Sequence, residues 1–161
     1  MDIIPKGIHM GLDYSLKLTT DMKRARALGL LAERIPELQW SEENKSLYAP
    51  DIIITVLELS REGDSIIEEN FGFRPSLSVG FRYPSNRDYE NFAKTMLRGA
   101  LPLLEQGRDG VLLFNGEIIV LQRREGRLVF NADYRLYRDE HWLKAHVPVP
   151  FERRSLPSPL L

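Results

Sequence analysis

Alternation of apolar and polar side chains marks two strands in this chain. In residues 12–18, LDYSLKL, every second position is apolar, and residues 76–83, SLSVGFRY, repeat this pattern. A period of two is that of a strand with one buried face. Residues 51–60, DIIITVLELS, form a nearly continuous apolar run. That run predicts a strand buried on both faces.

Apolar side chains at helical spacing predict two helices. The first covers about residues 21–34, and Pro36 stops it. The second is longer and carries the stronger apolar stripe, with Ser85 or Asn86 as its expected cap. Pro102 lies inside this stripe, where it should kink or end the last turn.

Residues 111–131, VLLFNGEIIVLQRREGRLVFN, hold three short apolar runs separated by two turn pairs. Asn-Gly at 115–116 is the stronger signal, because both central residues of a type I′ turn need a positive φ. Glu-Gly at 125–126 makes the second turn. The segment is therefore predicted to be a three-stranded antiparallel meander.

The other segments complete an α+β fold. Residues 36–50 look like a polar connection, residues 65–75 like a short strand or irregular loop, and residues 137–147 like a short helix with Trp142 packed on the body. The predicted class is an antiparallel sheet with a C-terminal three-stranded meander and one long helix on a face. The expected order is roughly β-α-β-β-α-β-β-β-α.

A length of 161 residues favours a single domain. We assign it to residues 10–147, followed by a Pro-rich extended tail at 148–161. Residues 5–10, PKGIHM, resemble a cloning remnant followed by a native start at Met10, so residues 1–9 are assigned to that remnant, with a flexible native N-terminus as the alternative. The chain has no cysteine, no apolar run long enough for a membrane helix and no signal-peptide pattern, so a cytoplasmic protein is expected.

Charge is distributed unevenly along a chain whose net charge is −1. Residues 36–72 carry nine acidic and two basic side chains. This acidic block is either a solvated loop face or a docking surface for a basic partner, with nearby aromatic residues as anchors. The candidate partner-binding residues are Trp40, Glu42, Glu43, Tyr48, Glu62, Asp64, Glu68 and Glu69.

The sequence offers little evidence of a catalytic or metal-binding site. His141 and His146 lie five residues apart, a spacing that does not suit two ligands on one helical face. The common phosphate-loop, nucleophile-elbow and zinc-protease motifs are missing from the sequence. Arg123, Arg124 and Arg127 are expected to be a solvated strand end and not a nucleic-acid site. No catalytic residue, metal or cofactor is therefore predicted.

Four stretches together resemble the Sit-type immunity proteins of myxobacterial swarm-inhibition toxin–immunity pairs. These stretches are GLDYSLKL, FGFRPSLSVGFRY, TMLRGALPLLEQG and GVLLFNGEIIVLQRREGRLVFN. The resemblance covers most of residues 10–131 and is strongest from Phe71 to Asn131. It rests on core and turn residues, and it implies no active site. Residues 36–70 and the tail lie outside it, where partner specificity would be expected.

The resemblance implies a cytoplasmic protein of bacterial kin discrimination that binds a cognate toxin domain and neutralises it in a stoichiometric complex. The acidic block suggests a basic toxin such as a nuclease. Two alternatives remain open: an assembly module that self-associates through a sheet edge, and a small hydrolase built from dispersed acids and His141. Neither a nucleic acid nor a membrane is an expected partner, and the oligomeric state stays undetermined.

Overall fold

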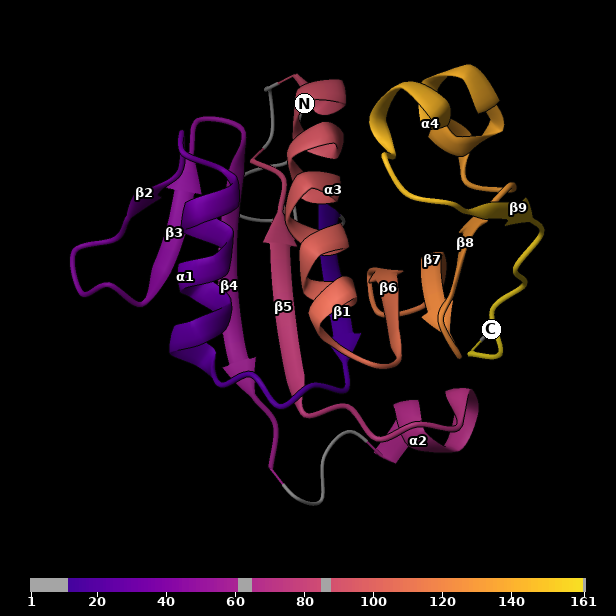
Figure 1. Cartoon of the computed structure of the whole chain (residues 1–161), viewed down its shortest axis with the longest axis horizontal. Helices are drawn as coiled ribbons and strands as arrows, with labels where there is room; N and C mark the ends of the chain where they lie inside the picture. The colour runs from indigo at the N-terminus through magenta and orange to yellow at the C-terminus, as the bar shows by residue number, and fades with distance from the viewer. Residues whose placement is uncertain (1–11, 61–64, 85–87, 161) are drawn as a thin grey trace.

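The computed structural model describes residues 12–60, 65–84 and 88–160. Within these residues, nine strands form one sheet in the order β2-β3-β4-β5-β1-β6-β7-β8-β9 (Figure 1). The strands are β1 (Asp13–Leu18), β2 (Gln39–Trp40), β3 (Ser46–Ala49), β4 (Ile52–Glu58), β5 (Leu77–Arg82), β6 (Gly110–Phe114), β7 (Ile118–Arg124), β8 (Arg127–Asn131) and β9 (Glu152–Arg154). Every pairing is antiparallel except that of β8 with β9, which is parallel.

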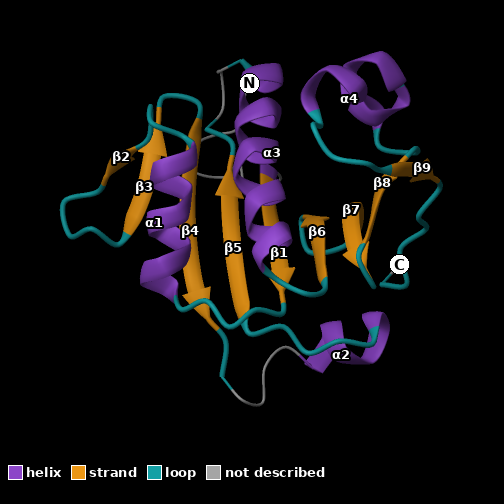
Figure 2. Cartoon of the chain, in the orientation of Figure 1, coloured by secondary structure: helices purple, strands orange, loops and turns teal. Residues whose placement is uncertain are grey.

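Helices α1 and α3 lie side by side in front of the sheet, and α4 lies beyond them near β8 and β9 (Figure 2). The helices are α1 (Arg24–Arg34), α2 (Ser65–Phe71), α3 (Tyr89–Gln106) and α4 (Glu140–His146), with a 3-10 turn at Arg135–Arg138. The predicted α+β class, the long helix and the meander are confirmed. Residues 152–154, expected in an extended tail, add the strand β9 to one edge of the sheet.

The main core fills the space between the sheet and the helices α1 and α3. Strand β1 is central, with Leu16 facing Val79 of β5 on one side and Leu112 of β6 on the other. All three side chains are fully buried. Gly99 allows α3 to approach α1 closely, because a Cβ there would lie 2.9 Å from Leu31 Cδ2. Burial of each such leucine stabilises the fold by roughly 1.5–3 kcal/mol.

A smaller core lies on the opposite face of the sheet, under β6, β7 and β8 only. Here α2 and the tail contribute Ile67, Phe71 and Leu156, which pack on Val111 of β6 and Val129 of β8. On the same face, the strands β3 and β4 have no comparable cover among the described residues, and their outward side chains are exposed. The sheet is therefore covered on both faces at one end and on one face at the other.

Several local predictions were wrong. Strand β4 is buried on one face only, with Ile52, Ile54 and Val56 inward and the residues between them exposed. Residues 65–71 form the helix α2, because Ile67 and Phe71 lie four residues apart and both face the smaller core. The polar connection holds two short strands, β2 and β3.

The start of α3 also differs from the prediction, and Pro102 does not end the helix. Asp88 caps the helix by accepting a hydrogen bond from the Asn91 N–H at 3.1 Å. Ser85 and Asn86, the expected caps, lie outside the described residues. The helix continues through Pro102 to Gln106, so the proline does not end it.

Both predicted turns of the meander have the backbone that their sequences require. Asn115 and Gly116 have φ values of 54° and 75°, and Glu125 and Gly126 have values of 52° and 80°. Two successive left-handed residues define a type I′ turn, whose twist matches that of the strands it joins. The first turn thereby sets the pairing of β6 with β7.

Replacing Asn115 and Gly116 together by valine is expected to lower the free energy of unfolding by about 2 kcal/mol, because β-branched side chains resist a positive φ. Urea unfolding followed by circular dichroism measures this loss. Glu117→Val is the matched control, since Glu117 is exposed beside the same turn and does not have a positive φ. An unchanged midpoint in the double variant would contradict the account of the turn.

Candidate partner-binding surface

The hairpin of β2 and β3 forms one edge of the sheet, and its loop is ordered by Ser41. The Ser41 hydroxyl oxygen accepts hydrogen bonds from the backbone N–H groups of Lys45 and Ser46, both at 3.1 Å. Its backbone carbonyl accepts from Asn44, which adopts a φ of 56°. These bonds support the loop of residues 41–45 and leave its acidic side chains in solvent.

Arg24, the first residue of α1, fastens this hairpin to β4. Its Nε donates to the Val56 carbonyl at 3.0 Å and its Nη2 to the Lys45 carbonyl at 2.5 Å. Its backbone N–H donates to Glu58 Oε2 at 2.8 Å. The loop therefore lies at the end of the sheet where β4 ends, supported by the helix layer, and it presents a preorganised surface.

The acidic candidates fall into two separate groups. Glu42 and Glu43 lie on the β2–β3 loop, whereas Glu68 and Glu69 lie on α2, under the strands β6–β8. Four strand spacings separate β3 from β6, which places the groups about 19 Å or more apart. Glu62 and Asp64 lie outside the described residues. The described acidic candidates thus do not form one patch.

Ion pairs reduce the charge of both groups. Glu43 pairs with Lys45 at 3.0 Å, and Glu68 pairs with Arg74 at 3.3 Å. The side chains of both pairs are largely exposed, so the pairs contribute little to stability. Among the described residues, Glu42 has no ion pair, which leaves it the freest negative charge of the loop.

The two aromatic candidates are exposed, but they lie on opposite faces of the hairpin. Trp40 pairs with Leu47, whose side chain enters the main core, whereas Tyr48 pairs with Gln39 and with Ile53. Paired residues of antiparallel strands share a face. Trp40 and Tyr48 are each 42% exposed, and a partner could contact both only by closing around the sheet edge.

Tyr48 continues instead into an apolar stripe on the open face of the sheet. Ile53 and Leu57 of β4 lie on this face and are 38% and 62% exposed. Tyr48 and Ile53 are direct cross-strand neighbours. Leu57 lies four residues after Ile53 on the same face of β4, towards the acidic loop. We call Tyr48, Ile53 and Leu57 the open-face stripe. An apolar stripe bordered by charged side chains is typical of a protein-binding surface.

Ile53 and Leu57 were not predicted as surface residues, because a run of β-branched and leucine residues resembles a fully buried strand. One signal was present. Thr55 interrupts the apolar run at the position that shares a face with both residues. Its polar side chain at that position fits an exposed face better than a buried one.

Of the arginines near the second meander turn, Arg123 and Arg124 are partly buried against the scaffold, contrary to the expected solvated strand end, whereas Arg127 is exposed as expected. Arg123 Nη1 donates to the carbonyls of Leu104 and Gly107 at the C-terminal end of α3, at 3.1 and 3.3 Å. The Arg124 guanidinium lies 5.2 Å from the centre of the Phe73 ring. Arg127 pairs with Glu152 of β9 at 2.6 Å. All three connect separate parts of the chain.

The two histidines do not form a site together. His146 Nδ1 is 2.8 Å from the Trp142 carbonyl, one turn earlier in α4, while His141 is exposed. In the described part of the chain, no group of three or more histidine, cysteine, aspartate or glutamate residues could hold a metal ion.

Buried and partly buried tyrosines form a polar cluster in and beside the main core. The hydroxyl of Tyr14 lies 2.6 Å from that of Tyr89 and 2.5 Å from that of Tyr134, and the latter two are also hydrogen-bonded to each other. Tyr137 is fully buried beside them, and its hydroxyl has no hydrogen-bond partner among the described residues. Burial, reinforced by neighbouring tyrosines, raises the pKa values of Tyr14, Tyr134 and Tyr137 well above the usual range.

Fold and surface together define an α+β protein with a mixed, mostly antiparallel sheet, helices over one face and an exposed apolar stripe on the other. The chain belongs to the SitI3-like family, whose family model matches residues 12–141, and this is a family of Sit immunity proteins. The resemblance seen in the sequence is thereby confirmed.

Other comparisons add no relatives. Neither the curated proteins nor the solved structures contain a significant match to this chain. None of the described helices combines the length and the apolar character that crossing a membrane requires.

Proposed function

We propose that this protein is a cytoplasmic, non-enzymatic immunity protein that binds the toxin domain encoded beside it and neutralises it in a one-to-one complex. Membership of a Sit immunity protein family is the observation that carries the proposal. Immunity by binding needs a rigid and exposed contact surface but no catalytic centre. The hairpin fastened by Arg24 and the open-face stripe beside it supply such a surface.

The toxin contacts the open-face stripe and the loop of residues 41–45 in this proposal. Tyr48, Ile53 and Leu57 provide the apolar centre, and Glu42 and Glu43 provide the charged border. Trp40 extends the contact around the sheet edge. Interfaces commonly combine an apolar, partly aromatic centre with a polar rim in this way. The excess of acids over bases in residues 36–72 suits a basic toxin, such as a nuclease.

Co-expression with the toxin domain tests the proposal. We expect growth to be rescued and the two proteins to copurify in equal amounts. Rescue without a complex would overturn inhibition by binding and would favour an enzyme that acts on the toxin's product or substrate. A lack of rescue would reject the function itself. A stable high-order oligomer that does not bind the toxin would support the alternative of an assembly module.

Reversing Glu42 and Glu43 to lysine is expected to slow toxin association about tenfold at low salt and to flatten its salt dependence, with an unchanged free energy of unfolding. Stopped-flow or surface plasmon resonance measures the rate. The matched control is reversal of Glu68 and Glu69, which changes the charge equally on α2. If both pairs slow association equally, the total charge of the protein and not the loop steers the toxin. If neither pair changes the association rate, the acidic residues have no part in the proposed contact.

A further inference from the structure

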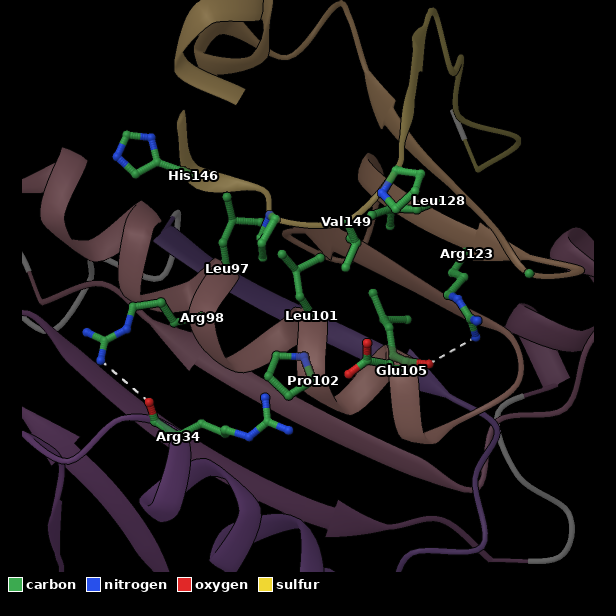
Figure 3. Close-up of a pocket in the computed structure, with 14 residues that line it drawn as sticks. Arg34, Leu97, Arg98, Leu101, Pro102, Glu105, Arg123, Leu128, His146 and Val149 are labelled. Carbon is green, nitrogen blue, oxygen red and sulfur yellow. Dashed lines mark hydrogen bonds between the residues drawn. The ribbon is translucent and has the colours of Figure 1, made fainter. Parts of the chain in front are cut away.

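A pocket of about 610 Å³ opens between α3 and residues 146–150, which link α4 to β9 (Figure 3). The end of α1 and the turn between β7 and β8 complete its wall. The volume lies within the range of about 300–1,000 Å³ that is common for small-molecule sites. The pocket is on the helix-covered side of the sheet, so it is separate from the open-face stripe proposed for the toxin.

Apolar side chains form the interior of the pocket. Leu97 and Leu101 enter it from α3, and Leu128 and Val149 lie opposite them (Figure 3). Leu97 and Leu128 are buried, while Leu101 and Val149 are partly exposed to the pocket opening. Pro102 of α3 also lines the pocket. A ligand would therefore place an apolar body here.

Positive charge surrounds this interior, and two of its three arginines are fixed by partners. Arg98 pairs with Glu37, with Nη1 and Nη2 at 2.5 and 3.2 Å from the two carboxylate oxygens. Arg123 donates to carbonyls at the C-terminal end of α3. That contact offsets the negative end of the helix dipole, which would otherwise repel an anion.

Arg34 is the third arginine, and it is available to a ligand. Its guanidinium lies along the rim below Pro102 (Figure 3), and it has no ion pair among the described residues. Glu105 is the single acidic residue on the lining. Glu37 neutralises Arg98. The remaining charged residues of the lining, Arg34, Arg123 and Glu105, together carry a net charge of +1.

We propose that this pocket binds a small amphipathic carboxylate, with its apolar chain or ring between α3 and residues 146–150 and its single acidic group at Arg34. The apolar lining selects the body, and the unpaired guanidinium selects the charge, since arginine and carboxylate form strong charge-assisted hydrogen bonds. This site shares no residue with the proposed toxin contact, because its lining lies beside α3 and the β7–β8 turn.

Calorimetric titration of the full chain at low salt tests the proposal with three probes of equal chain length: octanoate, 1-octanol and octylammonium. Octanoate is expected to bind at least about tenfold more tightly than either of the others. Equal binding of octanoate and octanol would overturn the role of charge. Tighter binding of octylammonium, or no binding of octanoate, would overturn the site.

Two variants locate the binding. Arg34→Glu is expected to weaken octanoate about tenfold, while Arg26→Glu, at another exposed arginine of α1 that is outside the pocket, leaves the affinity unchanged. Leu101→Trp would fill the pocket and abolish binding, provided that its unfolding midpoint stays near that of the wild type. Unchanged octanoate affinity in Arg34→Glu, or equal losses in both arginine variants, would overturn the proposal.

Discussion

Above about pH 10, the protein is expected to lose stability at a rate approaching 4 kcal/mol per pH unit. Tyrosines of the unfolded chain ionise near pH 10, whereas burial raises the pKa values of Tyr14, Tyr134 and Tyr137 far beyond that. The unfolded chain then releases three protons that the folded protein retains. Each retained proton lowers the free energy of unfolding by about 1.4 kcal/mol per pH unit. Below pH 10, this stabilisation is fully present.

Urea unfolding at pH 8, 10, 10.5 and 11 measures the slope. Replacing Tyr14 and Tyr137 by phenylalanine should reduce it to about 1.4 kcal/mol per pH unit, because only Tyr134 remains of the three. Tyr137→Phe removes a hydroxyl without a partner among the described residues, so it should cost little at neutral pH. Tyr48→Phe, at an exposed tyrosine, is the control. An unaltered slope in the double variant would show that other groups govern the alkaline transition.

The sequence predicted those elements whose local signals agree with their tertiary environment. The turn pairs at 115–116 and 125–126 require positive φ values, and any antiparallel meander with this spacing uses them in the same way. The stripe of α3 is long and strongly periodic, so a single inner proline did not obscure it. In both cases, the decisive interactions lie within a few residues of one another.

Predictions failed where contacts distant in sequence decide the structure. Residues 65–71 contain two adjacent isoleucines, Ile66 and Ile67, which favour a strand. Ile67 and Phe71 nevertheless gain more by packing as one helical face on β6 and β8. Strand β3 contributes one fully buried residue, Leu47, and so lacks a hydrophobic period of its own. Its pairing with β4 supplies the missing stabilisation.

The candidate surface was only partly predictable for the same reason. Charge along the sequence indicated residues 36–72, but strand order separates Glu42 and Glu43 on the β2–β3 loop from Glu68 and Glu69 on α2. Whether Ile53 and Leu57 are covered depends on where α2 packs, and α2 packs under β6–β8 instead of β4. No local pattern in the sequence encodes that choice, so the open-face stripe becomes visible only in the folded chain.

Replacing Tyr48 by alanine and Leu57 by aspartate together is expected to weaken toxin binding about 1,000-fold, or about 4 kcal/mol, on the interface proposed above. Loss of an aromatic anchor at an interface centre commonly costs about 2 kcal/mol or more. The aspartate adds a charge that the contact would bury without a partner. Both side chains are exposed in the free protein, so the free energy of unfolding should change by less than about 1 kcal/mol.

Ile66→Asp on α2 distinguishes a local contact from a general effect of losing surface apolar area. Ile66 is 56% exposed and Leu57 is 62% exposed, so the two substitutions remove similar surface and add the same charge. Isothermal titration with the toxin domain should give a wild-type dissociation constant for Ile66→Asp. Equal weakening by Ile66→Asp and Leu57→Asp would exclude the open-face stripe as the specific contact. Wild-type affinity in both variants would place the interface elsewhere, because an unpaired carboxylate buried at the centre of a tight complex must weaken binding.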